Sequence, residues 1–491
     1  MLARVLSCAT VGIQGLLVEV EADLGAGLPT FAIVGLPDAA IRESRERVLA
    51  ALRNTGFEFP ARKITVNLAP AHVRKEGARF DLPIAVALLL ASGQIPRHTA
   101  LEEGVFVGEL ALDGSLRGVR GVLAVAAAAR REGWGPLWVA RENLAEARAL
   151  DGMAVHALDS LAELRGDESV VRARRAPSPA PACEGSPPPD LSEVRGQSLA
   201  RRVLEIAAAG RHNVLFVGPP GAGKTMLARR LPGILPPLSR DEAVEVSTIH
   251  SVAGRLRGGG GLIEHPPFRS PHHTISEAGL VGGGRGPMPG EVTLAHRGVL
   301  FLDELPEFHR NAIEALRQPL EEGFVSITRA GSATIFPASF VMVAAMNPCM
   351  CGFRGHDRRS CRCAPEAVTR YWSKISGPIL DRIDLVLEVR ALPLGDLFEQ
   401  GQGEPSASVR ARVLDARARA AARPRARGNP ALHGEADAIL RRAAEAFSLS
   451  ARGLLRVRRV ARTIADLEGS AEVGPPHVSE ALQYRASAPV P

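Results

Sequence analysis

The feature that most constrains this chain is an eight-residue segment, Gly218-Pro219-Pro220-Gly221-Ala222-Gly223-Lys224-Thr225, which fits G-x-x-x-x-G-K-[ST] at every fixed position. Residues 214–217 before it form an apolar run of strand length, and residues 226–231 after it have a helical pattern. Between a strand and a helix, such a glycine-rich loop wraps its backbone amides around phosphate oxygens. We therefore expect a nucleoside triphosphate here, with the Lys224 ammonium on its β- and γ-phosphates and the Thr225 hydroxyl on Mg²⁺.

Two later strands are predicted to bring further polar groups to the same edge of a sheet. Residues 298–302 contain four consecutive apolar side chains, the pattern of a buried parallel strand, and Asp303 and Glu304 follow directly. Ligands of open α/β sheets bind at the carboxyl ends of the strands. We expect Asp303 to hold Mg²⁺ through water and Glu304 to polarise the attacking water. A third strand, 340–346, ends at Asn347, which is expected to contact the γ-phosphate or align that water.

Arg382 lies in the segment Asp381-Arg382-Ile383-Asp384 and is a candidate arginine finger. Such a residue stabilises the charge that develops on a transferring phosphoryl group. An arginine between two aspartates is by itself more often a salt-bridged structural residue. The ordered series of glycine loop, acidic strand end and asparagine strand end favours the catalytic interpretation.

This series of motifs resembles that of AAA+ ATPases, and further stretches resemble the magnesium-chelatase-like branch and, within it, the ComM (YifB) family. Those stretches are 31–38 (FAIVGLPD), 66–70 (VNLAP), 268–274 (FRSPHHT), 301–308 (FLDELPEF) and 346–349 (MNPC). The likeness covers nearly the whole chain. It implies an ATP- and Mg²⁺-dependent enzyme that assembles as a homo-hexameric ring. Members of the family act as helicases for branch migration during natural transformation.

Residues 1–165 are predicted to form one α+β domain that resembles the proteolytic domain of Lon-type proteases. The resemblance lies in residues 75–81 and 107–117. In that family the first segment carries a nucleophilic serine, and a lysine follows the second. Arg79 stands at the serine position, and residues 121–129 contain no lysine. Because a Ser–Lys dyad needs both a hydroxyl and an amine base, we expect no peptidase activity.

A proline-rich linker, 166–190, is predicted to separate this domain from the nucleotide-binding domain, 191–392. Residues 393–491 are predicted to form an all-helical lid. The chain is therefore expected to be an α/β multidomain protein, with the Lon-like domain first, the AAA+ domain second and the helical lid last.

The predicted lid holds most of the excess positive charge of the chain. Residues 401–491 contain 15 arginines, no lysine and nine acidic residues. This surplus fits an anionic partner or, equally, a solvated helix surface. Apolar residues recur at three- and four-residue steps after Ser450, which predicts a long capped helix. Arg452, in its first turn, stands where AAA+ lids carry a second sensor arginine, and Arg456 is the rival candidate.

Four cysteines fall within 15 residues as two C-x-C pairs, Cys349 with Cys351 and Cys361 with Cys363. Four thiolates can close a tetrahedral Zn²⁺ site, although C-x2-C spacing is commoner in such sites. A structural zinc, free reduced thiols and a redox pair stay open as alternatives. The clustering differs from a secreted disulfide scaffold and indicates a reducing, cytoplasmic compartment. No apolar stretch is long enough to span a membrane.

Two adjacent histidines, His272 and His273, precede the predicted acidic strand. Adjacent side chains in a strand point to opposite faces, which argues against a shared metal ion. A structural role or a contact with substrate is expected instead.

The leading function is therefore an ATP-driven ring motor that acts on single-stranded or branched DNA. Aromatic residues make up only 4% of the chain, so base stacking is not its expected mode of DNA contact. Two alternatives come from other classes, a chelatase-type ATPase that remodels a protein partner and a nucleotide-gated DNA-binding scaffold. ATP hydrolysis that responds to DNA would distinguish the motor from both.

Overall fold

The computed structural model describes residues 1–165, 187–256, 261–284, 287–329, 332–356, 359–391, 403–423, 432, 434–447 and 449–486. The chain divides into two compact units. The first comprises residues 1–185, 240–264 and 285–288, and the second comprises residues 186–239, 265–284 and 289–491. Most of the predicted linker, residues 166–186, lies outside the described part. The three predicted boundaries, after residues 165, 190 and 392, stay predictions.

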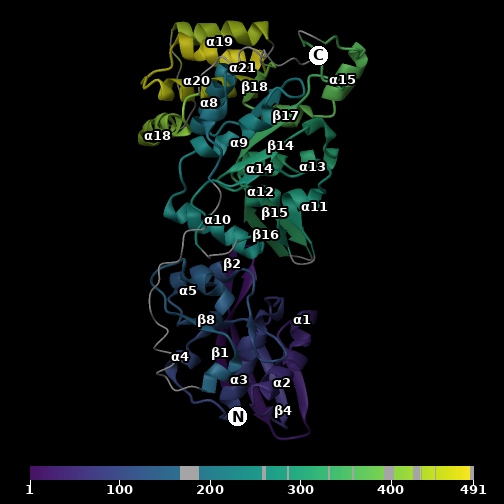
Figure 1. Ribbon diagram of the computed structural model, residues 1–491, viewed down its shortest axis with the longest axis vertical. Helices are drawn as coiled ribbons and strands as arrows, with labels where there is room; N and C mark the ends of the chain where they lie inside the picture. The colour runs from purple at the N-terminus through teal and green to yellow at the C-terminus, as the bar shows by residue number, and fades with distance from the viewer. Residues whose placement is uncertain are drawn as a thin grey trace. The chain divides into compact units, whose positions relative to one another are not determined.

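The first unit is built on a seven-stranded sheet in the order β3-β4-β2-β1-β5-β8-β9 (Figure 1). Its strands are β1 (Leu2–Val11), β2 (Gln14–Gly25), β3 (Thr30–Val34), β4 (Lys63–Ala69), β5 (Val105–Val107), β8 (Leu137–Ala140) and β9 (Val155–Leu158). The long hairpin β1–β2 is antiparallel, and β5, β8 and β9 continue the sheet in parallel beyond β1. In β4, buried residues alternate with exposed or half-buried ones, as expected where one face of a strand is turned toward solvent.

Helices of the first unit follow the apolar patterns of their sequences. Residues 39–54 form two helices, α1 (Ala39–Arg42), capped by Asp38, and α2 (Ser44–Asn54). Helix α3 (Asp81–Ser92) is buried from Asp81 to Ala91, because its sequence is apolar on every side. Arg47 of α2 donates two hydrogen bonds, at 2.6 and 3.0 Å, to the buried carboxylate of Asp81, the first residue of α3.

Helix α10 (Arg240–Val252) belongs to the first unit although it follows the phosphate-binding segment in the sequence. It packs on α5 (Val122–Glu132). The backbone N–H of Gly121 donates to the carbonyl of Ser251 at 3.1 Å, which joins the start of α5 to the end of α10. An insertion into the nucleotide-binding sequence thus completes the fold of the N-terminal region.

The second unit contains a five-stranded parallel sheet in the order β11-β14-β17-β10-β18. The strands are β11 (Phe268–Arg269), β14 (Val299–Leu302), β17 (Val341–Met346), β10 (Val214–Val217) and β18 (Leu385–Glu388). All residues of β10, β14 and β17 are buried, as expected for strands covered on both faces. Because the strands are parallel, the chain segments that follow β10, β14 and β17 meet at one edge.

Helices α8 (Ser198–Gly210) and α9 (Lys224–Ile234) cover this sheet and share a core with the C-terminal helices (Figure 1). Those are α18 (Ser406–Ala422), α19 (Glu435–Ala446), α20 (Ala451–Leu467) and α21 (Pro475–Ala486). Ser450 caps α20 as predicted, accepting a hydrogen bond from the Gly453 N–H at 3.1 Å. Arg202 of α8 donates to Glu480 of α21 at 2.9 Å. Among the described helices, none is both long and apolar enough to cross a bilayer.

A hairpin projects from this unit immediately before β17. It pairs β15 (Phe324–Arg329) with β16 (Ser332–Pro337) in antiparallel register, Phe324 opposite Pro337. The architecture as a whole is mixed α/β and multidomain, with parallel strands flanked by helices.

Candidate active site

The glycine-rich loop leaves the buried strand β10 and enters α9 at Lys224. Its first residue, Gly218, lies against the segment after β18, since a Cβ there would come within 2.2 Å of the Val389 carbonyl oxygen. Gly223, at the other end of the loop, has a φ of +89°, a conformation that side chains other than glycine rarely adopt. The predicted strand–loop–helix context is present, and it places the loop at the N-terminus of α9, where helix dipoles favour anions.

The Lys224 side chain is held at the centre of this loop. Its Nζ donates hydrogen bonds to the carbonyls of Gly218 at 2.6 Å and Pro219 at 2.9 Å, and to Oδ1 of Asn347 at 3.2 Å. Burial lowers the pKa of Lys224, while the charges of Asp303 and Glu304 oppose that shift. The third contact joins the loop to the end of β17, where sequence had predicted a γ-phosphate-sensing amide.

Thr225 and Asp303 meet at the neighbouring strand end. The Thr225 hydroxyl donates to Oδ2 of Asp303 at 2.8 Å, and the backbone N–H of Glu304 donates to Oδ1 at 3.0 Å. A hydroxyl and a carboxylate at this distance are the oxygen ligands that Mg²⁺ uses, directly or through water, in nucleotide sites. The donor set therefore fits Mg²⁺ bound together with phosphate oxygens.

Glu304 is exposed beside this pair and has a left-handed backbone, with φ at +53°. Such a conformation is rare for residues other than glycine and aims the side chain out of the line of the strand. Oε2 of Glu304 lies 3.6 Å from Nδ1 of His273. A carboxylate in this position can orient a water toward a phosphate bound at the loop.

The expectation that His272 and His273 lie in a strand, with their side chains on opposite faces, was wrong. Strand β11 ends at Arg269, and His272 and His273 follow in a turn with their rings 4.1 Å apart. Ser270 and Pro271 separate the strand from the turn, so the alternation of side chains in a strand does not apply. The contact between His273 and Glu304 was not foreseen, because no short-range pattern joins residues so far apart in the chain.

Arg382 lies away from the groups around Lys224. It precedes β18, whose first residue, Leu385, pairs with Val214 at the start of β10. The glycine loop leaves the far end of β10, so about 10 Å of strand separates the two edges. Arg382 forms an ion pair with Glu321 and donates to the Pro378 carbonyl at 2.5 Å. Its Nε is buried and makes no hydrogen bond within the described part of the chain.

The two lid arginines occupy different environments. Arg456 is buried on α20, 3.7 Å from Asp384, and donates weakly to the Ile383 carbonyl at 3.4 Å. Arg452 is exposed one turn earlier. The pKa of Glu321 is lowered chiefly by its hydrogen bond with Arg382, and the charge of Arg452 adds to the effect. Arg452 and Arg382 thus share the neighbourhood of one carboxylate.

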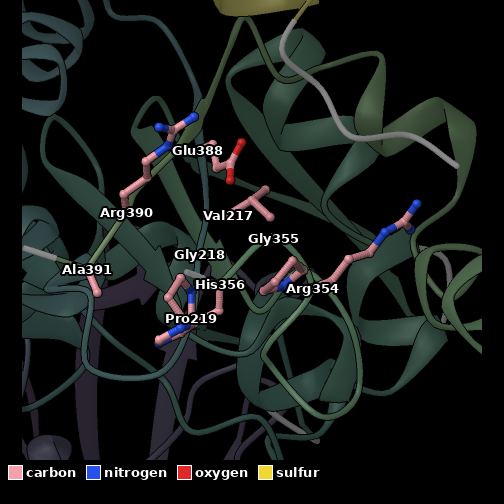
Figure 2. Close-up of a pocket in the computed structure, with 10 residues that line it drawn as sticks. Val217, Gly218, Pro219, Arg354, Gly355, His356, Glu388, Arg390 and Ala391 are labelled. Carbon is pink, nitrogen blue, oxygen red and sulfur yellow. The ribbon is translucent and has the colours of Figure 1, made fainter. Parts of the chain in front are cut away.

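A cavity of about 240 Å³ adjoins the glycine loop (Figure 2). Gly218 and Pro219 form one wall, and two segments that the sequence analysis did not assign to the site form the others. They contribute Arg354 and His356 after β17, and Glu388 at the end of β18 with Arg390 after it. The volume is below the roughly 300 Å³ at which ligand pockets usually begin. The cavity therefore suits one end of a nucleotide.

Gln197 also belongs to this neighbourhood. Its side-chain amide donates to the Arg390 carbonyl at 2.7 Å, and its backbone has a φ of +49°. Residues such as Gln197 and Arg354 carry no sequence motif of their own, and only the fold brings their segments to the loop.

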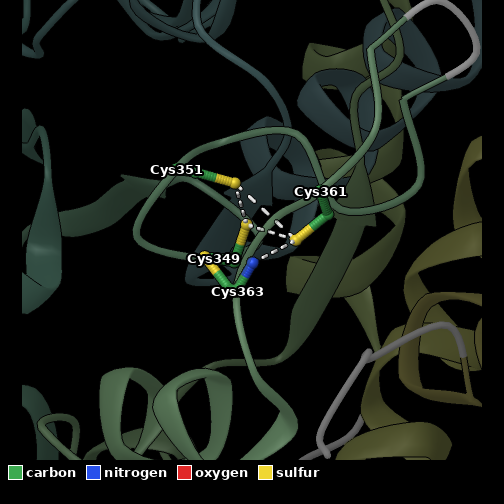
Figure 3. A group of neighbouring side chains, drawn as sticks. All are labelled: Cys349, Cys351, Cys361 and Cys363. Carbon is green, nitrogen blue, oxygen red and sulfur yellow. Dashed lines mark hydrogen bonds between the residues drawn. The ribbon is translucent and has the colours of Figure 1, made fainter.

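The four clustered cysteines lie together next to this site (Figure 3). Their sulfur atoms are all within 4.8 Å of one another, and none of the four forms a disulfide. Hydrogen bonds with the backbone of Phe353 and Arg362 lower the pKa of the Cys351 thiol to about 6. The cluster brings together the two C-x-C pairs, which are separated by a loop of basic residues.

Comparison with known proteins gives matches along nearly the whole chain. The model of magnesium chelatase subunit ChlI matches residues 190–397, that of its C-terminal part matches residues 403–485, and a further ChlI model matches residues 20–143. Competence protein ComM of Haemophilus influenzae is 44% identical over 504 residues, covering 99% of this chain and 97% of the relative. YifB of Escherichia coli is 43% identical over 494 residues, covering 97% and 96%. The magnesium-chelatase 67 kDa subunit of Chlorobaculum tepidum is 28% identical over 160 residues, 32% of this chain and 23% of that protein.

Proposed function

The chain belongs to the ComM/YifB family of magnesium-chelatase-like AAA+ ATPases, and from that premise we propose that it is a ring-forming motor that uses ATP hydrolysis to move branched DNA. The substrate class is single-stranded or branched DNA, and the reaction is branch migration during recombination or natural transformation. The proposed cofactors of hydrolysis are ATP and Mg²⁺.

The observation that carries the ATPase proposal is the arrangement around Lys224. Its ammonium contacts both the glycine loop and Asn347, so one γ-phosphate oxygen could be reached by the cation and the amide together. Thr225 and Asp303, whose side chains are hydrogen-bonded, would hold Mg²⁺ when the nucleotide is bound. Glu304 then acts as the group that orients the attacking water. These roles correspond to four of the parts that phosphoryl transfer requires: a phosphate cradle, a metal, a sensor and a base.

The remaining part, a cation for the transition state, supports a ring. Arg382 lies at the opposite edge of the sheet from the loop of its own subunit. We therefore propose that Arg382 and Arg452 act on the nucleotide of a neighbouring subunit, in a homo-hexamer. Glu321 holds Arg382 within the free subunit, and the incoming γ-phosphate would replace it as the anionic partner.

The DNA part of the proposal rests on the relatives and on charge. One full-length relative is named competence protein ComM, and the resemblance to its family implies a role in natural transformation. Several arginines of the C-terminal helices are already paired, as Arg423 and Arg462 are with Asp466. Others, including Arg442 and Arg459, are exposed on the helix surface, where phosphates could be bound. The hairpin β15–β16 is the candidate element for contact with the translocating strand.

The terminal domains have supporting roles in this proposal. The N-terminal domain is taken as Lon-like in fold and without peptidase activity, with Arg79 donating to the Arg120 carbonyl at 3.1 Å where a nucleophile would be needed. The C-terminal helices act as the AAA+ lid.

We assign the protein to the cytoplasm. A zinc ion, proposed for the cysteine cluster, has no part in phosphoryl transfer.

The decisive experiment measures ATP hydrolysis by the full-length protein with and without forked DNA, alongside migration of a labelled four-way junction. Forked DNA should raise turnover, and junction migration should require ATP. Glu304→Gln should retain nucleotide binding and lose both activities. Hydrolysis that is indifferent to DNA, with no junction migration, would refute the motor.

The chelatase-type alternative has one specific observation in its favour, the match of three ChlI models along the chain. Under that function, hydrolysis would respond to a partner protein in place of DNA. The same hydrolysis assay, with forked DNA exchanged for a soluble extract depleted of nucleic acid, separates the two functions.

A further inference from the structure

We propose that Cys349, Cys351, Cys361 and Cys363 bind a single Zn²⁺ ion, and that this ion holds in place a loop that packs on the phosphate-binding loop. The proposed metal site is inferred from the positions of the four cysteine sulfurs alone. Its effect on nucleotide binding rests on the proposed ATPase function.

The spacing of the sulfur atoms fits a tetrahedral tetrathiolate site. Zinc–sulfur bonds of about 2.3 Å place the sulfurs of a tetrahedron roughly 3.8 Å apart. The Sγ atom of Cys349 is 3.4 Å from that of Cys351 and 3.7 Å from that of Cys361, and Cys351 and Cys361 are 3.6 Å apart. A disulfide would need a separation of about 2.05 Å. The Cys363 sulfur lies within 4.8 Å of the other three. The four side chains are thus grouped closely without disulfide bonds, and Figure 3 shows them together.

The backbone around the cluster supplies the hydrogen bonds that tetrathiolate sites usually have. Cys351 has hydrogen bonds with the backbone of Phe353 and Arg362, and the N–H of Cys363 donates to Sγ of Cys361 at 3.5 Å. Such N–H donors partly neutralise thiolate charge and orient the ligands. Four soft thiolates in tetrahedral positions select zinc over the hard cations Mg²⁺ and Ca²⁺.

The cluster is anchored directly to the candidate active site. Cys349 follows Asn347 by two residues, and the intervening Pro348 carbonyl accepts a hydrogen bond from Trp372 Nε1 at 3.2 Å. Trp372 belongs to α15 (Pro365–Trp372), which begins two residues after Cys363. The ion would thus join the end of the sensor strand to the start of α15, across a loop with little apolar material of its own.

The loop between the two C-x-C pairs packs on the phosphate-binding loop. Gly352 has a φ of +83°, and a Cβ there would lie 2.8 Å from Cδ of Pro220 and 3.9 Å from Cγ of Asn347. Arg354 and His356, further along, line the cavity beside Gly218. The zinc-bound loop is therefore one wall of the nucleotide cavity, and its loss should loosen that wall.

The test uses full-length protein purified in reducing buffer without chelators. Zinc and iron per chain are measured by plasma mass spectrometry for the wild type, Cys361→Ser/Cys363→Ser and the control Cys183→Ser, which alters a cysteine outside the cluster. We expect about one zinc per chain in the wild type and control and little in the double variant. Cobalt-substituted protein should show the absorption bands of a tetrahedral tetrathiolate.

Nucleotide binding is followed with a fluorescent ATP analogue before and after zinc is released by a mercurial and then restored. Affinity should fall several-fold on release and recover on addition of zinc. Lys224→Ala should lose nucleotide affinity while keeping its zinc, which separates a failed nucleotide site from a failed metal site. Stoichiometric iron, disulfide-linked cysteines or absence of zinc would overturn the metal site. Unchanged affinity after zinc release would overturn its proposed effect on the loop.

Discussion

Nδ1 of His273 lies 3.6 Å from Oε2 of Glu304, although 31 positions separate the two residues in the chain. This is an ion-pair distance when the imidazole is protonated. Glu304 already has an unusual left-handed backbone, so its carboxylate is oriented both by the turn after β14 and by a side chain that follows β11. The relationship makes His273 a positioning residue for the proposed water-activating group.

We expect His273→Ala to lower the rate of ATP hydrolysis by about tenfold while leaving the KM for ATP unchanged. The reason is that the substitution frees the Glu304 carboxylate without touching the loop that binds phosphate. His272→Ala is the matched control, since Nδ1 of His272 contacts Thr274 instead. A raised KM with an unchanged rate would contradict this role for His273.

Thr225→Ala should raise the concentration of Mg²⁺ needed for half-maximal hydrolysis. The Thr225 hydroxyl is 2.8 Å from Asp303 and would be lost as a metal ligand. Thr225→Ser keeps the hydroxyl and should behave like the wild type. Magnesium titrations at saturating ATP measure the effect, and equal curves for alanine and wild type would exclude Thr225 as a ligand.

Arg382→Ala should bind ATP normally and hydrolyse it at least 10³-fold more slowly, the usual effect of removing an arginine finger. Mixing it with Lys224→Ala should restore part of the activity, because a mixed ring contains interfaces with an intact loop on one side and an intact arginine on the other. Hydrolysis rates across a series of mixing ratios measure this. If Arg382 acted within its own subunit, no ratio would recover activity.

Arg47→Ala should destabilise the first unit by about 3 kcal/mol, because it leaves the buried Asp81 carboxylate without its cation. Arg45→Ala is the control, as Arg45 pairs with the exposed Glu46 and should change stability by less than about 0.5 kcal/mol. Hydrogen exchange of α3 in the full chain reports the difference.

The loss of stability caused by Arg47→Ala should depend on pH, and the pKa of Asp81 determines the direction of that dependence. Burial raises the pKa of Asp81 to about 6, while the hydrogen bond from Arg47 opposes the shift. An acid whose pKa is raised on folding contributes stability below its unfolded pKa and loses it as pH rises through the folded value. Without Arg47 the folded pKa rises further, so the deficit of the variant should shrink as pH falls below 7. A deficit that grows on acidification would contradict a buried, unpaired carboxylate.

Several parts of the candidate site could be predicted because each is carried by a short local pattern. The glycine loop, the acidic residues after β14 and Asn347 after β17 each follow a buried apolar run, and parallel strands necessarily bring their carboxyl ends to one edge. The cysteine cluster could also be predicted, because its two C-x-C pairs lie within one short segment of the sequence. The family, too, was recognisable from stretches of this kind.

Other relationships depend on contacts between distant segments and have no local signal. Helix α10 lies within the sequence of the nucleotide-binding domain yet completes the first unit by packing on α5. The turn that directs His273 to Glu304 and the packing of Gly352 on Pro220 likewise join separate loops. The sequence by itself determined the chemistry available, namely which phosphate, metal and thiolate ligands the chain carries. Only the tertiary structure decided which of these groups meet, because side-chain packing and loop geometry act across positions that periodicity and spacing do not connect.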